Sequence, residues 1–185
     1  TIGFGNMPHI SADGLRVSCL PSGEAWSEVI ADIYVTNENC QLILHQNGLC
    51  RQLTPDGADA HYIWSSVSPD GTKILYNTQH GTSVCNLQGQ KVAYLGHINA
   101  PVWYGNDYVV GHLDLAEDIE TISSVILMAK ADGTAVQQLT TNSEIAMYPS
   151  ASPATGRIVY NNLAGDVRML QLNLAENVIP QQLPQ

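Results

Sequence analysis

Basic residues are scarce in this sequence of 185 residues. Seven Lys and Arg stand against 17 Asp and Glu, which gives a formal net charge of −10. A protein that binds nucleic acid needs clustered Lys and Arg to displace the counterions of the phosphates, and here the basic residues are scattered singly. The same shortage argues against polyanionic sugars and anionic lipid surfaces. The composition therefore excludes nucleic acid as the expected partner and favours neutral or cationic ones.

Long apolar runs are also missing. The longest uncharged apolar stretch, Ser123–Ala129, is far shorter than the roughly 20 residues that cross a bilayer, so we expect no membrane span. No signal peptide is visible, and the chain opens on Thr1, so we interpret it as a mature or trimmed product. At 44% hydrophobic residues the chain can still fill a core.

Motifs for catalysis and for metal binding are missing as well. The cysteines Cys19, Cys40, Cys50 and Cys85 form no Cys-x-x-Cys pair and have no His at zinc-finger spacing. We expect buried free thiols, with one disulfide as the alternative. There is no Gly-x-Ser-x-Gly motif, and Gly3–Gly5 lacks the third glycine of a phosphate-binding loop. We therefore expect no catalytic residue and no cofactor, with a divalent metal as the alternative.

What the sequence does contain is an internal repeat. Arg51–Thr54 (RQLT) recurs 86 residues later as Gln137–Thr140 (QQLT), and Gln181–Leu183 (QQL) follows 44 residues after that. A period near 43 residues is typical of the blades of a β-propeller. We predict one domain over residues 1–185, with repeats at approximately 7–54, 55–96, 97–140 and 141–184.

Each repeat has the same order of elements. A short segment with Pro or Trp is followed by a turn such as Pro69–Gly71, an alternating strand, a loop, a third strand, a second turn such as Asn47–Gly48, and a closing strand. The expected second and third strands are Leu15–Leu20 and Gln41–Gln46, Lys73–Thr78 and Thr82–Leu87, Asp107–His112 and Ser124–Lys130, and Arg157–Asn162 and Asp166–Leu172. The predicted fold class is all-β, a β-propeller of about four four-stranded antiparallel blades, or a partial propeller.

Three local features leave the pattern less regular. Residues 31–37 also alternate like a strand, which would give the first repeat an extra hairpin. Two insertions, near Trp26 and from Leu115 to Ile122, have helical spacing, so one helical turn is expected at most. Trp64 and Trp103 recur in the first strands, and we interpret both as core between blades.

Residues 68–76 (SPDGTKILY) resemble the blade signature of TolB-like propellers, as does Ala131–Gly133 followed by Gln138–Thr140. The same blade occurs in the propellers of prolyl oligopeptidase-type enzymes. The resemblance covers residues 7 to 184, but the first repeat lacks the Pro of the signature and the fourth lacks its Asp. The family usually closes with six or more blades. The resemblance thus implies a rare four-bladed ring or a fragment, and a fragment would expose blade faces and strand edges that invite self-association.

The candidate ligand-binding residues come from the loops of one face. In propellers, the loops before the first strand and after the second strand share a face, where ligands bind. The candidates on that face are His61, His80, His97, His112, Trp26 and Tyr148. Trp26 lies in an insertion and would be an exposed aromatic platform for a sugar or peptide.

The most specific cluster on that face joins His112 to Asp114 and Asp118. Alternation places His112 and Asp114 on one side of a strand, and imidazole with carboxylates can bind a divalent metal. A solvated acidic loop with one surface histidine is the plainer interpretation.

Two functional hypotheses follow. The first is a non-catalytic scaffold, exported from the bacterial cytoplasm as the resemblance implies and so periplasmic or extracellular after signal-peptide removal. It would bind a protein, a peptide or a small ligand on the loop face. The second is an enzyme, or the accessory propeller of a hydrolase or lyase, with a metal or glycan in the channel.

Overall fold

The computed structural model describes residues 5–10, 17–21, 33–117, 120–143 and 145–172. Over these residues the chain is an all-β protein with one short 3₁₀ helix, η1 (Pro153–Thr155). None of the described helical segments has the length and apolarity to cross a bilayer. The predicted fold class is therefore confirmed, with ring closure not seen among the described residues.

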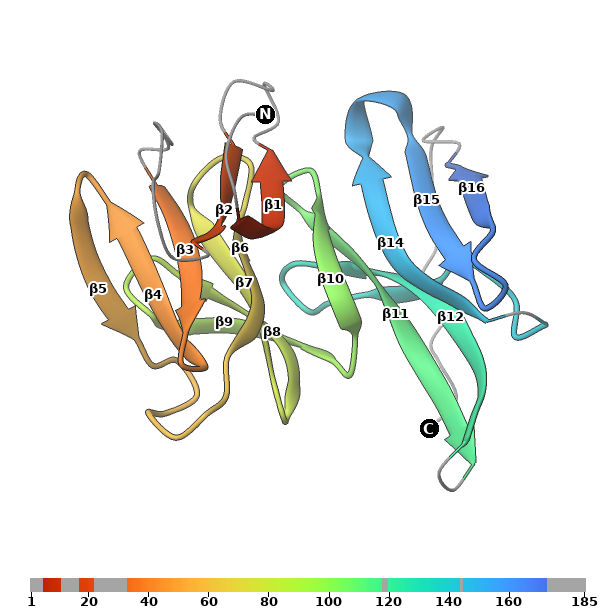
Figure 1. The fold of residues 1–185 in the computed structure, drawn as a ribbon, viewed down its shortest axis with the longest axis horizontal. Coiled ribbons are helices and arrows are strands. Elements are labelled where there is room, and N and C mark those ends of the chain that lie inside the picture. The colour runs from red at the N-terminus through yellow and green to blue at the C-terminus, as the bar shows by residue number, and fades with distance from the viewer. Residues whose placement is uncertain (1–4, 11–16, 22–32, 118–119, 144, 173–185) are drawn as a thin grey trace.

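Four antiparallel sheets follow one another along the chain (Figure 1). The first sheet contains β3 (Ile33–Glu38), β4 (Gln41–Gln46) and β5 (Leu49–Leu53). The second contains β6 (Ile63–Val67), β7 (Lys73–Thr78), β8 (Gly81–Asn86) and β9 (Lys91–Gly96). The third contains β10 (Asn99–Tyr104), β11 (Tyr108–Glu117), β12 (Glu120–Lys130) and β13 (Val136–Gln138). The fourth contains β14 (Ala146–Ser152), β15 (Arg157–Asn162) and β16 (Val167–Gln171).

The start of the chain differs from the predicted first blade. A separate N-terminal hairpin pairs β1 (Gly5–Ile10) with β2 (Val17–Pro21), and neither strand belongs to the first sheet. The place beside β4 is taken by β3, so the extra strand expected near residues 31–37 is present. Asn39 and Cys40 join β3 to β4 with φ of 50° and 60°, the left-handed pair that a tight hairpin turn requires. The segment of Gln181–Leu183, expected to close the fourth blade, lies outside the described residues.

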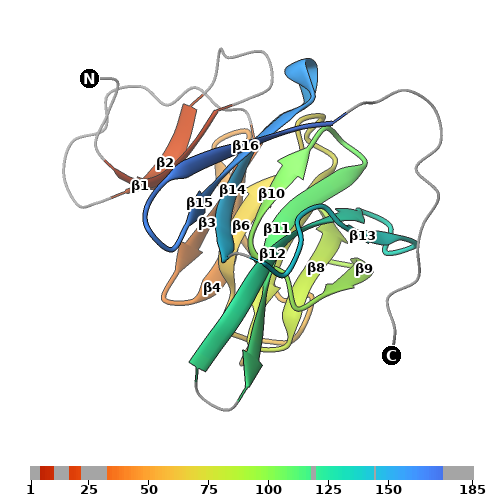
Figure 2. The ribbon, with the colours of Figure 1, turned by 90° about the vertical axis from the view of Figure 1, so that its right-hand side faces the viewer.

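The described residues of the insertion between Leu115 and Ile122 are strand and not the helical turn that its spacing suggested. Leu115 belongs to β11 and Ile122 to β12, and the two strands pair along almost their whole length. Figure 2 shows this hairpin extending well beyond the neighbouring strands. Spacing over so short a segment is a weak signal for a helix, and here the pairing of the two strands prevails. The insertion near Trp26 lies outside the described residues.

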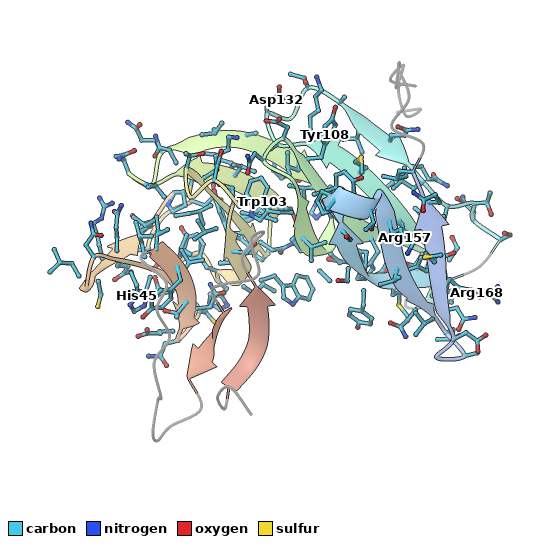
Figure 3. The ribbon with its side chains drawn as sticks, turned by 90° about the horizontal axis from the view of Figure 1, so that it is seen from above. His45, Trp103, Tyr108, Asp132, Arg157 and Arg168 are labelled. Atoms are coloured by element: carbon cyan, nitrogen blue, oxygen red, sulfur yellow. The ribbon has the colours of Figure 1, made fainter. Side chains whose placement is uncertain are left out.

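Consecutive sheets pack face to face, so alternate residues of one strand enter different cores. Leu75 packs toward the third sheet with Trp103 and Val109, whereas Ile74 and Tyr76 pack toward the first. In the third sheet Val110 and Ile126 pack against Ile158 and Tyr160 of the fourth. Figure 3 shows the resulting arc from above, with His45 near one end, Trp103 inside, and Arg157 and Arg168 near the other end.

The aromatic and cysteine predictions are confirmed only in part. Trp103 is core, 6% exposed, and its indole N–H donates to the Ser66 carbonyl (3.3 Å). Trp64 is only half-buried and belongs to none of the three cores between the sheets, so its assignment was wrong. Cys85 is a buried free thiol, and burial raises its pKa to about 12. Cys40 and Cys50 are free but exposed.

Candidate functional site

The site is organised by a bulge that recurs in the first strand of the second, third and fourth sheets. The pairing register shifts between Ile63 and Ser66 in β6, between Asn99 and Val102 in β10, and between Met147 and Ser150 in β14. A bulge inserts an unpaired residue and redirects a side chain away from the regular alternation. One bulge residue in each strand has a positive φ: Trp64 (50°), Ala100 (44°) and Tyr148 (52°). Because residues with side chains rarely adopt this conformation, its recurrence marks an imposed geometry.

A second position lies opposite the residue that precedes each bulge. It is occupied by Asn77 in β7, His112 in β11 and Asn161 in β15. We call it the bulge-facing position, because in β7 and β11 the side chain there contacts the next sheet at its bulged strand or just before it. Asn77 donates its amide N–H to the Ile98 carbonyl (2.9 Å), just before β10.

His112 makes the corresponding contact between the third and fourth sheets. It is 3% exposed, its Nδ1 accepts the Tyr148 backbone N–H (3.4 Å), and the two rings meet edge to face with centroids 5.2 Å apart. With Nδ1 as acceptor, the proton of the neutral ring lies on Nε2, which is 3.7 Å from Asp114 Oδ1. Burial lowers the pKa of His112, and the charge of Asp114 opposes that shift only in part. The ring is thus held neutral.

The carboxylate of Asp114 is fixed from one side only. Its Oδ2 accepts a hydrogen bond from Asn99 Nδ2 (2.9 Å), whereas Oδ1 receives none from the described residues. The Tyr148 side chain, which contacts His112, is 60% exposed. The predicted residues His112, Asp114 and Tyr148 therefore come together, and Asn99 joins them as a residue that sequence reasoning placed on the face without assigning it a role.

The other predicted histidines gather at the same end of the molecule. The His61 backbone N–H donates to Gln79 Oε1 (3.1 Å), and the His80 carbonyl accepts the Tyr94 hydroxyl (3.0 Å). His97 immediately precedes Ile98, which Asn77 holds beside the β7–β8 turn. All three histidines are exposed. This end, which we call the loop face, carries the β7–β8 turn and the paired ends of β11 and β12, both at the bottom of Figure 1.

A metal site is not assembled from the described residues. No three His, Cys, Asp or Glu side chains among residues 5–10, 17–21, 33–117, 120–143 and 145–172 are grouped closely enough to hold an ion. The predicted ligands His112 and Asp114 are neighbours, but the third, Asp118, lies outside those ranges, as does Trp26. The metal hypothesis remains a prediction.

Sequence reasoning missed two groups. Trp64 occupies the same bulge position as Tyr148, and no signal in the sequence marks it, because the bulge residues follow the preceding repeat ends at unequal distances. His45 stacks on Tyr34 with ring centroids 4.4 Å apart and shares a 2.9 Å hydrogen bond with Thr36 Oγ1. Burial lowers the pKa of His45, with Glu38 opposing. The signal for this pair was strand alternation, which places both rings on the outer side of the first sheet.

The geometry can be compared with known proteins. No protein-family description matches the sequence, and no curated protein matches it. Solved structures do match. A protein described as a putative TolB from Agrobacterium tumefaciens aligns with a TM-score of 0.56 and 13% identity, over 90% of this chain and 76% of that one. TolB from Acinetobacter baumannii aligns with a TM-score of 0.51 and 14% identity, over 89% of this chain and 42% of that one.

The chain thus spans less than half of the Acinetobacter protein and about three quarters of the Agrobacterium protein. At such identities the likeness concerns the fold. The chain is structurally similar to TolB β-propeller proteins over about 90% of its length.

Proposed function

We propose that this chain is a non-catalytic β-propeller scaffold whose loop face binds a protein or peptide, with a small ligand as the lesser variant. The observation that carries the proposal is the exposed ring of Tyr148, held at a strained bulge by the buried His112. The surrounding structure stabilises a conformation that a tyrosine rarely adopts, and such strain is concentrated at functional sites.

The chemistry of this group suits recognition rather than reaction. A tyrosine offers a large apolar ring with a polar tip, loses little conformational entropy when bound, and is enriched at interface hot spots. The partly exposed carboxylate of Asp114 adds one negative charge next to His112, whose ring contacts Tyr148. Together with the net charge of −10, this favours a neutral or basic partner segment.

Export from a bacterial cytoplasm is part of the same proposal. Its support is the likeness of the fold to TolB together with the resemblance of the repeats, so we propose a periplasmic or extracellular location. The alternative function is an enzyme or accessory propeller with a metal or glycan. The described residues add no further metal-ligating side chain to His112 and Asp114.

The proposal is tested by a substitution at the bulge. The purified chain is used to capture partners from a bacterial envelope extract, and the affinity of a captured partner is measured for the wild type, Tyr148→Ala and Leu49→Ala. Leu49 is 76% exposed at the β4–β5 turn and serves as the control. We expect Tyr148→Ala to weaken binding by about 2 kcal/mol or more, as at other interface hot spots, and Leu49→Ala to leave it unchanged.

Two results would contradict the proposal: capture of no partner, or equal affinities for the wild type and Tyr148→Ala. A triple variant with alanine at His61, His80 and His97 measures whether the contact extends across the loop face. Circular dichroism of each variant separates loss of binding from loss of fold.

A further inference from the structure

The outer face of the fourth sheet repeats a face that is buried elsewhere in the molecule. Within the third sheet Val110 pairs with Met128 and His112 pairs with Ile126. Within the fourth sheet the same positions pair Val159 with Met169 and Asn161 with Val167. The correspondence is fixed by the bulges, because His112 and Asn161 both lie opposite the residue before the bulge.

The burial of these equivalent positions is opposite. Val110 and Ile126 are fully buried beneath the fourth sheet, and Met128 is partly buried there. Their counterparts Val159, Val167 and Met169 are 37%, 69% and 58% exposed. With Leu163 in the adjoining turn, these side chains form an exposed apolar surface, which we call the terminal face. Exposed apolar surface of this kind marks a binding site.

The terminal face also carries the polar group that selects its neighbour. His112 contacts the bulged first strand of the next sheet, and Asn77 contacts the residue just before such a strand. In the first sheet, Asn37 exchanges two hydrogen bonds with Ser65 of the bulged strand β6 (2.8 and 3.2 Å). Asn161 occupies the bulge-facing position of the fourth sheet. The terminal face is therefore built to receive a bulged strand with apolar neighbours.

The described chain holds one further strand of this kind. In β1 the register shifts between Asn6 and His9, so Met7 and Pro8 form a bulge. Pro8 corresponds to Pro101 of β10 and Pro149 of β14, each the second residue of its bulge. The N-terminal hairpin thus reproduces the first two strands of a unit. It lies beside the first sheet through contacts of β2 with β3.

We propose that the terminal face of one molecule binds the N-terminal hairpin of a second copy. The bulged strand β1 of the partner copy occupies the place that β14 takes on the third sheet, with Asn161 hydrogen-bonded to its backbone and Val159, Val167 and Met169 packed beneath the hairpin. The two contacting surfaces are different, so the association is head to tail.

The association itself is tested by sedimentation velocity over a series of protein concentrations. We expect the mean mass of the wild type to rise with concentration. Val167→Asp with Met169→Asp places two charges on the terminal face, and we expect it to raise the apparent dissociation constant by about a hundredfold, about tenfold for each buried side chain. Val92→Asp is the control, because Val92 is apolar and 51% exposed on β9, away from the terminal face.

A wild type that remains monomeric at every concentration would overturn the proposal, and so would a double variant that associates as the wild type does. Because Val167 and Met169 are exposed in the monomer, both variants are expected to fold, and circular dichroism verifies this. Loss of association in the Val92 variant would also count against the terminal face as the contact.

The hairpin is tested as the occupant by photo-crosslinking from Leu163, which is 74% exposed at the rim of the terminal face. A benzophenone amino acid replaces Leu163 in an unlabelled copy that is mixed with isotopically labelled wild type. Crosslinks from the unlabelled chain to residues 5–21 of the labelled chain support the proposal. Crosslinks only within one chain, including those to residues 173–185, or only to other sheets of the second copy, refute it.

Discussion

At the scale of single residues, the side chain at the bulge-facing position is an amide in the second sheet and an imidazole in the third, and each joins its sheet to the next. Asn77 uses an amide, which keeps the same hydrogen bonds at every ordinary pH, whereas His112 uses a ring that must stay neutral to accept the Tyr148 N–H. A protonated ring would place an N–H on Nδ1, facing another N–H. The contact beneath the exposed Tyr148 is therefore sensitive to acid, while its equivalent in the second sheet is not.

The substitution His112→Asn tests this difference. Because the pKa of His112 is lowered in the folded state, the unfolded chain binds more protons between the two pKa values, and stability falls as the pH drops through the unfolded value near 6.5. We expect His112→Asn to fold and to show a weaker loss of stability between neutral and mildly acidic pH. The measurement is the urea midpoint across that range.

His80→Asn is the control, since His80 is exposed. His45, whose pKa is also lowered, leaves part of the acid dependence in the His112 variant. An unchanged pH dependence in His112→Asn would show that its neutrality contributes nothing to stability.

The sequence could predict those parts of the site in which the residues are close neighbours on one strand. Alternation placed His112 beside Asp114, and the shared loop face brought Tyr148 near them. The equivalence of Trp64 with Tyr148 was hidden, because a bulge adds a residue that leaves no distinct mark in the sequence and shifts every later position. The sequence consequently aligned Trp64 with Trp103, which lies two residues beyond its own bulge and enters the core.

At the scale of elements, strands with turn signals at both ends were located best. Lys73–Thr78, Arg157–Asn162 and Gln41–Gln46 are strands with the predicted bounds. The strands at the base of the β11–β12 hairpin were predicted, but its extension beyond His112 and before Ser124 was missed, because the other units have no such extension and the sequence between these strands contains no glycine. Pairing of β3 with β4 was only an alternative, since both candidate strands of the first unit alternate equally well and tertiary packing decides between them.

The equivalent strands β12 and β16 differ in burial, so the same kind of substitution should change the free energy of unfolding by different amounts. Ile126→Ala removes a fully buried side chain between the third and fourth sheets, and we expect a loss of about 2–5 kcal/mol of unfolding free energy. Val167→Ala, at the matching position of β16, is expected to cost less than about 0.5 kcal/mol because its side chain is 69% exposed. Urea unfolding at low protein concentration measures both, and equal losses would contradict the exposure of the terminal face.

At the scale of the whole molecule, charge opposes compactness. With 17 acidic and seven basic residues, the folded chain repels itself more than the expanded chain does. Some of the basic residues already form contacts within the protein, as Lys91 does with Asp56 (2.7 Å) and Lys73 with the Asn106 carbonyl (3.0 Å). Much of the negative charge therefore has no internal counterpart.

Salt is expected to stabilise the fold for this reason. Raising the ionic strength to about 0.15 M shortens the screening length to about 8 Å, and a gain of about 1 kcal/mol would raise the melting temperature by about 2–4 °C. Thermal unfolding in a sodium chloride series tests this expectation. Replacing the exposed Asp59 and Asp107 by Asn should raise the melting temperature at low salt and reduce the further rise that salt produces. A melting temperature that falls as salt is added would contradict this expectation.

The recurring bulge has a consequence for how such a protein can vary. Its backbone is the same whether the residue with positive φ is Trp64, Ala100 or Tyr148, so the geometry does not depend on the size of the side chain that it presents. We expect substitution there to alter what the protein offers to its surroundings and to leave the cores between the sheets intact, since none of the three residues belongs to those cores. The bulges are thus separate, replaceable display positions, at which new specificity can be selected, in nature or in a library, without rebuilding the propeller.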